Sequence, residues 1–140
     1  MRTPVLATAA LLLALPAAAD EPERVPPVSH EPTKKECGEC HMAFQPGLLP
    51  AESWRGIMAG LADHFGEDAS LEADLAAEIE AYLTANAGRG NGTKLRITEQ
   101  GWFRYEHAFP DQVWQKSEIR SKANCEACHR DAAQGSYEDD

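Results

Sequence analysis

All four cysteines of the chain lie in two short motifs that share one pattern, residues 37–41 (CGECH) and residues 125–129 (CEACH). Two cysteines at this spacing can each add to one vinyl group of the same heme, and the histidine that follows then lies under the iron. The repeated motif therefore predicts two covalently bound hemes c. The attachment residues would be Cys37, Cys40, Cys125 and Cys128, with His41 and His129 as the proximal ligands.

Other chemistries of a C-x-x-C pair fit less well. A zinc ribbon places its two cysteine pairs roughly 15–20 residues apart. Here the whole of residues 42–124 separates the motifs, and neither histidine is explained. A thioredoxin-like redox motif needs a βαβ context, but the chain has almost no β-branched runs. Four cysteines in an exported chain would ordinarily suggest two disulfides, and the paired histidines argue against that interpretation.

The N-terminus has the features of a secretory signal peptide, residues 1–19. Arg2 supplies a positive charge, residues 5–15 are almost entirely apolar, and residues 17–19 form an A-x-A cleavage site before Asp20. The apolar run is much shorter than the ~20 residues of a membrane-spanning helix. We therefore expect the mature protein to be exported to the periplasm and not to be membrane-embedded, in agreement with heme attachment outside the cytoplasm.

The chain is acidic, with 13 Lys and Arg against 23 Asp and Glu and a formal net charge of −10. This balance disfavours nucleic acid and anionic lipid as partners, because binding to either depends on basic side chains that neutralise phosphates. Residues 63–80 contain acids and no Lys or Arg. That run is either a solvated face or one end of a charge dipole that orients docking partners. We expect a monomer.

The sixth ligand of each iron decides between electron transfer and ligand chemistry. His64 belongs to a predicted amphipathic helix within residues 51–65, with Ser53 as N-cap and Gly66 as the stop signal. It shares the apolar face of that helix, so we expect it to bind the first heme iron. His107 lies in an aromatic-rich stretch, residues 101–110, shortly before the second motif, and we expect it to bind the second heme iron.

Two further residues are reserve axial ligands. His30 precedes the first motif in a proline-rich segment and could fold back over the first heme. Met58 shares the helix face with His64, and a His/Met iron would have a higher potential than a bis-His iron. Met42 directly follows the proximal histidine and would have difficulty reaching the opposite heme face, so we set it aside.

The sequence predicts a mainly α fold, a small diheme c-type cytochrome with two short heme-centred subdomains. A second helix is expected over residues 71–87, and the glycine-rich residues 88–92 then break the chain. We therefore expect an N-terminal heme subdomain over residues 20–90 and a C-terminal one over residues 91–140. The latter would contain a short strand near residues 94–98, a helix after Pro110 and a mobile acidic tail.

Several stretches together resemble the dihaem cytochrome c family of bacteria, often abbreviated DHC. They are residues 36–50 (ECGECHMAFQPGLLP), 54–71 (WRGIMAGLADHFGEDASL), 82–87 (YLTANA), 96–98 with 102–103 and His107, and 121–129 (SKANCEACH). The resemblance implies two bis-His hemes and electron transfer, with axial pairs drawn from His41, His64, His107 and His129. It also implies other cytochromes as partners, including a small oxygen-binding high-spin c-type cytochrome and, in some contexts, a membrane b-type cytochrome.

These features favour a periplasmic electron carrier over an enzyme. Two low-spin irons would each accept one electron with little rearrangement of their ligands. The alternative is a heme enzyme, such as a peroxidase, or a gas-binding protein, and either would need an open or displaceable sixth site. Three spare histidines for two irons argue against that alternative.

Overall fold

The computed structural model describes residues 24–138, and within them the chain forms helices and turns with no named strand. The α-helices are α1 (Glu31–Cys37), α2 (Ala51–Ala59), α3 (Ala73–Ala85), α4 (Gly101–Glu106) and α5 (Asp111–Trp114). The 3-10 turns are η1 (Pro46–Leu48), η2 (Leu61–Asp63), η3 (Ile97–Glu99), η4 (Cys125–Ala127) and η5 (Ala132–Gln134). The mainly α prediction is confirmed. The predicted signal peptide lies outside the described residues, as do Asp139 and Asp140.

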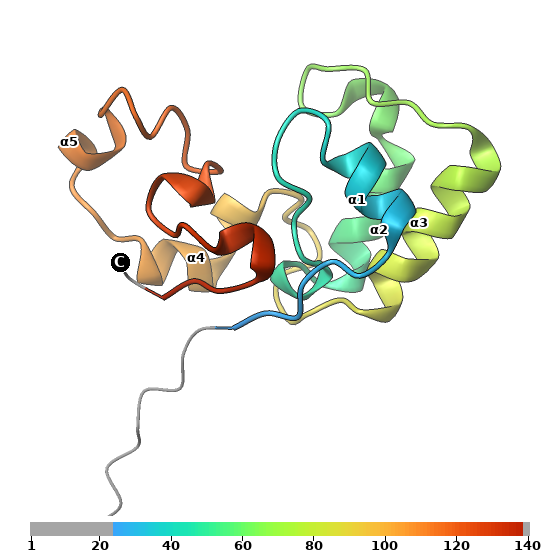
Figure 1. The fold of residues 1–140 in the computed structure, drawn as a ribbon, viewed down its shortest axis with the longest axis horizontal. Helices are drawn as coiled ribbons and strands as arrows, with labels where there is room; N and C mark the ends of the chain where they lie inside the picture. Colours follow the sequence, from blue (N-terminus) through green and yellow to red (C-terminus); the bar gives the residue numbers. More distant parts are fainter. Residues whose placement is uncertain (1–23, 139–140) are drawn as a thin grey trace, which may run out of the picture.

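The helices gather on two sides of the molecule. Figure 1 shows α1, α2 and α3 together on one side, and α4, α5 and the C-terminal segment on the other. The main apolar core lies between α2 and α3 and consists of Leu49, Trp54, Met58, Ile79 and Leu83. The indole Nε1 of Trp54 donates a hydrogen bond to the Pro46 carbonyl at 2.8 Å. This bond ties α2 to η1 and satisfies a buried polar group that would otherwise be costly.

The helix predicted within residues 51–65 is shorter than expected. It begins at Ala51, with Pro50 as N-cap, so the prediction that Ser53 caps it is wrong. The Ser53 hydroxyl is buried and instead donates to the Lys94 carbonyl at 2.7 Å. The helix ends at Ala59 because Gly60 leaves helical geometry, and η2 then leads to His64. His64 is therefore held by a turn beyond the helix and not on the helix face.

The remaining local predictions are partly right. The second predicted helix forms as α3, with Glu72 as its N-cap. The short strand predicted near residues 94–98 is absent from the described structure, where this segment forms turns and η3. The segment packs on α2, since a Cβ on Gly56 would meet the Leu95 side chain at 2.7 Å. The helix predicted after Pro110 forms as α5, with Pro110 as its N-cap.

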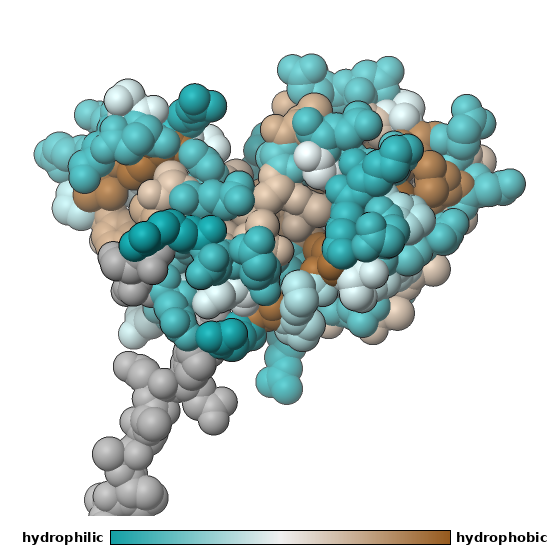
Figure 2. Space-filling view, viewed as in Figure 1, coloured by the Kyte–Doolittle hydropathy of each residue, from teal (hydrophilic) through white to brown (hydrophobic). Residues whose placement is uncertain are grey.

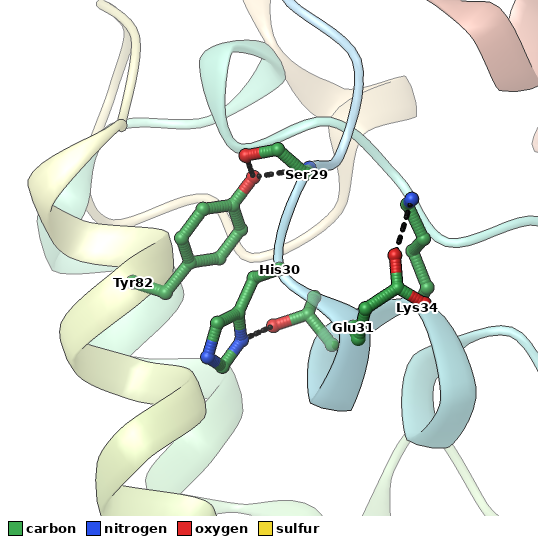
Figure 3. Close-up of polar contacts among 6 residues, drawn as sticks. Ser29, His30, Glu31, Lys34 and Tyr82 are labelled. Atoms are coloured by element: carbon green, nitrogen blue, oxygen red, sulfur yellow. Dashed lines mark hydrogen bonds and ion pairs between the residues drawn. The ribbon is translucent and has the colours of Figure 1, made fainter.

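The N-terminal segment is fixed to α3 by His30 and Tyr82. The imidazole of His30 stacks on the Tyr82 ring with 4.8 Å between centroids, and its Nδ1 lies 2.9 Å from the Thr33 hydroxyl. The Tyr82 hydroxyl in turn accepts a hydrogen bond from the Ser29 amide at 2.9 Å (Figure 3). Because α1 leads directly into the first motif, these contacts fix where that motif begins.

Both ends of the described chain meet. The Val25 amide donates to the Gly135 carbonyl at 2.8 Å, and Arg24 pairs with Glu138 at 3.2 Å. Residues 134–138, which the sequence assigns to a mobile tail, thus have defined partners in this structure. The division into subdomains at residues 20–90 and 91–140 remains a prediction. No helix in the described part of the chain has the length and apolar character to cross a membrane.

Candidate metal centres

The two histidines expected at the first iron lie close together. His41 follows the first cysteine pair just after α1, and His64 occupies the turn after η2. Their ring centroids are 6.3 Å apart and their planes differ by 26°. The fold therefore brings together two residues that the sequence places far apart.

The second expected pair has nearly the same separation. His107 is the C-cap of α4, and His129 directly follows the second cysteine pair. Their ring centroids are 6.2 Å apart, but here the planes are inclined at 80°. The two pairs thus share one spacing and differ in the mutual rotation of their imidazoles.

This spacing suits a single iron between each pair. An imidazole nitrogen binds a transition metal at about 2.0 Å, and the ring centroid lies about 1.1 Å beyond that nitrogen. Two imidazoles on opposite sides of one iron therefore have centroids roughly 6.2 Å apart. Both observed separations agree with that value, so the residues present fit the axial positions of two hemes.

Backbone carbonyls orient three of the four imidazoles. Nδ1 of His41 donates to the Met42 carbonyl at 2.8 Å, and Nδ1 of His107 donates to the Phe103 carbonyl at 3.0 Å. Nδ1 of His129 donates to the Glu138 carbonyl at 3.3 Å. A histidine whose Nδ1–H is used in this way presents the lone pair of Nε2 to a metal. The same hydrogen bond fixes the ring plane and increases the basicity of the ligand.

His64 reaches its position through a strained turn. Phe65 has a φ of 57°, a left-handed conformation that is unusual for a bulky residue. The Arg96 guanidinium lies 3.9 Å from the centroid of the Phe65 ring and supports it. Burial, followed by the nearby His41 and Arg96, lowers the pKa of His64. The neutral imidazole, which is the form that binds metals, is favoured as a result.

His107 sits in an aromatic cluster. The Phe103 ring stacks on its imidazole with centroids 4.0 Å apart and an angle of 7°. Phe109 and Trp114 approach from other directions, at 6.1 Å and 6.3 Å. The Phe109 side chain remains 50% exposed, and Phe65 beside His64 is 42% exposed. These exposed rings flank the two sites and offer flat apolar surface for a porphyrin to cover.

The comparisons with known proteins agree with this geometry. The chain matches the family described as dihaem cytochrome c over residues 33–137. The chain belongs to the dihaem cytochrome c family. The resemblance inferred from its motifs is thereby confirmed.

Solved structures of the family have the same fold. The structure of DHC purified from Rhodobacter sphaeroides is 46% identical, with a TM-score of 0.71, and the match covers 79% of this chain and 98% of that one. A diheme cytochrome c from the same organism gives 42% identity and a TM-score of 0.72, covering 80% and 99%. A diheme cytochrome type c from Shewanella baltica OS155 is 39% identical with a TM-score of 0.67, and the match covers 74% of this chain and 82% of that one. No match was found among curated proteins.

As a dihaem cytochrome c, the protein carries two covalently bound hemes c, and its family indicates a heme-based electron carrier. No disulfide joins any of the four cysteines, so all four are available for heme attachment. Cys37 ends α1 and Cys125 begins η4. Before heme attachment, burial raises the pKa of the Cys37 thiol and raises that of the Cys125 thiol to about 11.

Both motifs of this dihaem cytochrome c contribute to the lining of one cavity. A cavity of about 420 Å³ is lined by residues of the first motif and by Glu126 of the second. Its lining residues are Val28, Lys34, Gly38, His41, Met42, Ala43, Glu126 and Ala133. Figure 2 shows a notch between the two sides of the molecule, with apolar surface exposed towards α5.

The two reserve ligands are engaged elsewhere. Met58 belongs to the buried core between α2 and α3. Both ring nitrogens of His30 have partners, since Nε2 lies 3.0 Å from a Glu78 carboxylate oxygen and Nδ1 contacts Thr33.

Several residues that support the sites could not be recognised from the sequence. Gln45 is a buried polar residue within an apolar stretch, and no periodicity distinguishes it. Tyr137 packs edge-on against the His129 ring at 5.5 Å, although it lies in a stretch expected to be mobile. Phe103 is the exception, because its placement four residues before His107 puts both on one face of a helix.

Proposed function

We propose that this protein carries electrons between redox partners through two low-spin hemes and is not an enzyme. His41 and His64 would be the axial ligands of the first heme iron, and His129 and His107 those of the second. The observation that carries the proposal is the pair of centroid separations, 6.3 Å and 6.2 Å, which leave room for one iron and no further ligand.

Each heme, when bound, supplies an iron that accepts and releases a single electron. The surrounding residues keep the ligands in place through that change. The hydrogen bonds from Nδ1 to the carbonyls of Met42, Phe103 and Glu138 hold three imidazoles in one orientation. Ring contacts with Phe103 and Phe44 restrict His107 and His41 further. A site that rearranges so little is suited to electron transfer.

The location and partners form part of the same proposal. An N-terminal segment of signal-peptide type supports export to the periplasm, where the mature chain would act as a monomer. Other cytochromes would be its partners, including a small oxygen-binding high-spin c-type cytochrome or a membrane b-type cytochrome. The mass of the purified exported protein tests the first point, since it should correspond to loss of residues 1–19 and gain of two hemes.

The axial assignment is tested by adding carbon monoxide to the reduced protein. With both sixth positions filled by histidine, the ferrous spectrum should not change. The matched variants His64→Ala and His107→Ala each open one site, so each should bind carbon monoxide at one heme of the two. A clear shift on a large fraction of the heme in the unmodified protein would instead favour a gas-binding protein or a peroxidase-like enzyme.

A further inference from the structure

The end of the described chain folds over the second site as a short strap, residues 135–138. The Glu138 carbonyl accepts the hydrogen bond from Nδ1 of His129 at 3.3 Å. The Tyr137 ring lies against the same imidazole at 72°, with 5.5 Å between centroids. The strap thus provides the hydrogen-bond acceptor for the proximal imidazole and also one of the walls that limit its rotation.

Gln45 holds the strap from the other side of the molecule. The Tyr137 hydroxyl donates a hydrogen bond to Oε1 of Gln45. Nε2 of Gln45 donates to the Ala132 carbonyl at 2.7 Å, in η5, just beyond His129. The Gln45 side chain is fully buried, so loss of either partner would leave a polar group unsatisfied.

The position of Gln45 is set by the scaffold of the first site. Its neighbour Phe44 packs against the His41 ring with 4.8 Å between centroids. Its other neighbour, Pro46, begins η1 and accepts the hydrogen bond from the buried Trp54. Gln45 therefore extends from the core of α1–α3 into the turn that carries the second proximal ligand.

We propose that Gln45 and Tyr137 are positioning residues for His129, so that residues of the first half of the chain help to set the reduction potential of the second heme. An acceptor on the proximal imidazole increases its basicity and stabilises the ferric state, and the potential falls accordingly. Releasing the strap weakens the bond from His129 to Glu138 and raises that potential. This inference rests on the proposed axial pairs.

The test compares three tyrosine and glutamine variants of the complete holoprotein. Tyr137→Phe keeps the ring and removes only the hydroxyl, whereas Gln45→Leu removes both hydrogen bonds. Tyr82→Phe is the matched control, because it removes a tyrosine hydroxyl that bonds Ser29, away from His129. Each is titrated with a redox mediator series and examined by EPR. His64→Met and His107→Met assign the two steps, since a Met ligand raises the potential of its own heme.

In Tyr137→Phe and Gln45→Leu, we expect the reduction potential of the second heme to rise and that of the first heme to stay the same. A tenfold change in the ferric-to-ferrous ratio at a fixed potential corresponds to about 59 mV for one electron. The low-spin signal of the second heme should also change its g values, while Tyr82→Phe leaves the second heme as it was. Should Gln45→Leu fail to accumulate with heme, Tyr137→Phe decides the question alone.

Two results would overturn the inference. One is unchanged g values and potentials in Tyr137→Phe, and the other is an equal shift of both hemes, which would indicate general loosening. Failure of the axial assignment looks different, because the unmodified protein would then show a high-spin signal or bind carbon monoxide. An unmodified protein with two low-spin signals and an unresponsive Tyr137→Phe variant would refute the role of the strap and leave the proposed function intact.

Discussion

Gly135 is a position where a single methyl group should disturb the second site. Its φ is +81°, and a Cβ built there would lie 1.9 Å from the Val25 carbonyl oxygen. In Gly135→Ala the left-handed conformation costs about 1 kcal/mol. The clash also forces apart the Val25–Gly135 hydrogen bond, which costs about 1 kcal/mol more. The exposed Arg24–Glu138 pair adds little. We therefore expect a loss of about 2 kcal/mol in the free energy of unfolding.

Guanidinium unfolding of the holoprotein, followed by tryptophan fluorescence, measures this loss. With a slope of about 4 kcal/mol per molar, the midpoint should fall by about 0.5 M. Gly101→Ala is the matched control, because a Cβ at that helical position meets nothing within 4 Å. Its midpoint should stay the same or rise slightly. If Gly135→Ala and Gly101→Ala unfold at the same midpoint, the reasoning about the close approach of the two chain ends is refuted.

Three further predictions concern the histidines. His64→Met and His107→Met should each raise the potential of one heme and leave the other nearly unchanged in a redox titration. EPR of the oxidised protein should give two distinct low-spin signals, with the larger maximum g value at the second heme. The reason is that the imidazole planes are near parallel at the first iron (26°) and near perpendicular at the second (80°). Identical signals from the two hemes would contradict this prediction. His30→Ala should destabilise the protein by about 1–3 kcal/mol in the same unfolding assay, since the buried Thr33 hydroxyl loses its partner. A change in the heme absorption spectrum of His30→Ala would show instead that His30 is a heme ligand.

The chemistry of this protein could be predicted from sequence because it is encoded locally. The two cysteine pairs and their histidines lie within five-residue motifs, and no tertiary information is needed to recognise them. The mainly α fold follows from the apolar periodicity of α2 and α3. The pairing of His64 with His41, and of His107 with His129, was expected from context, and the structure brings the members of each pair to a common spacing.

Other features depend on contacts between distant residues and could not be predicted in this way. Ser53 is of a residue type that often caps helices, but its buried hydroxyl donates a hydrogen bond to the Lys94 carbonyl instead. Gly60 ends α2 and η2 then leads to His64, so the helical periodicity that placed His64 on a helix face is interrupted before the histidine is reached. The partnership of Gln45 with Tyr137 joins residues at opposite ends of the sequence, and no local pattern marks it.

The strap also has a consequence for the order in which the protein is built. The ligands of the first site, His41 and His64, lie 23 residues apart in the sequence, whereas the acceptor for His129 is held in place by a contact with the start of the described chain. Closing Val25 onto Gly135 spans almost the whole described chain, and loops of that length close late in folding. The second site should therefore mature last. An affinity tag placed close to Glu138 would lie beside the carbonyl that orients His129, so such a tag should be removed before the second heme is measured.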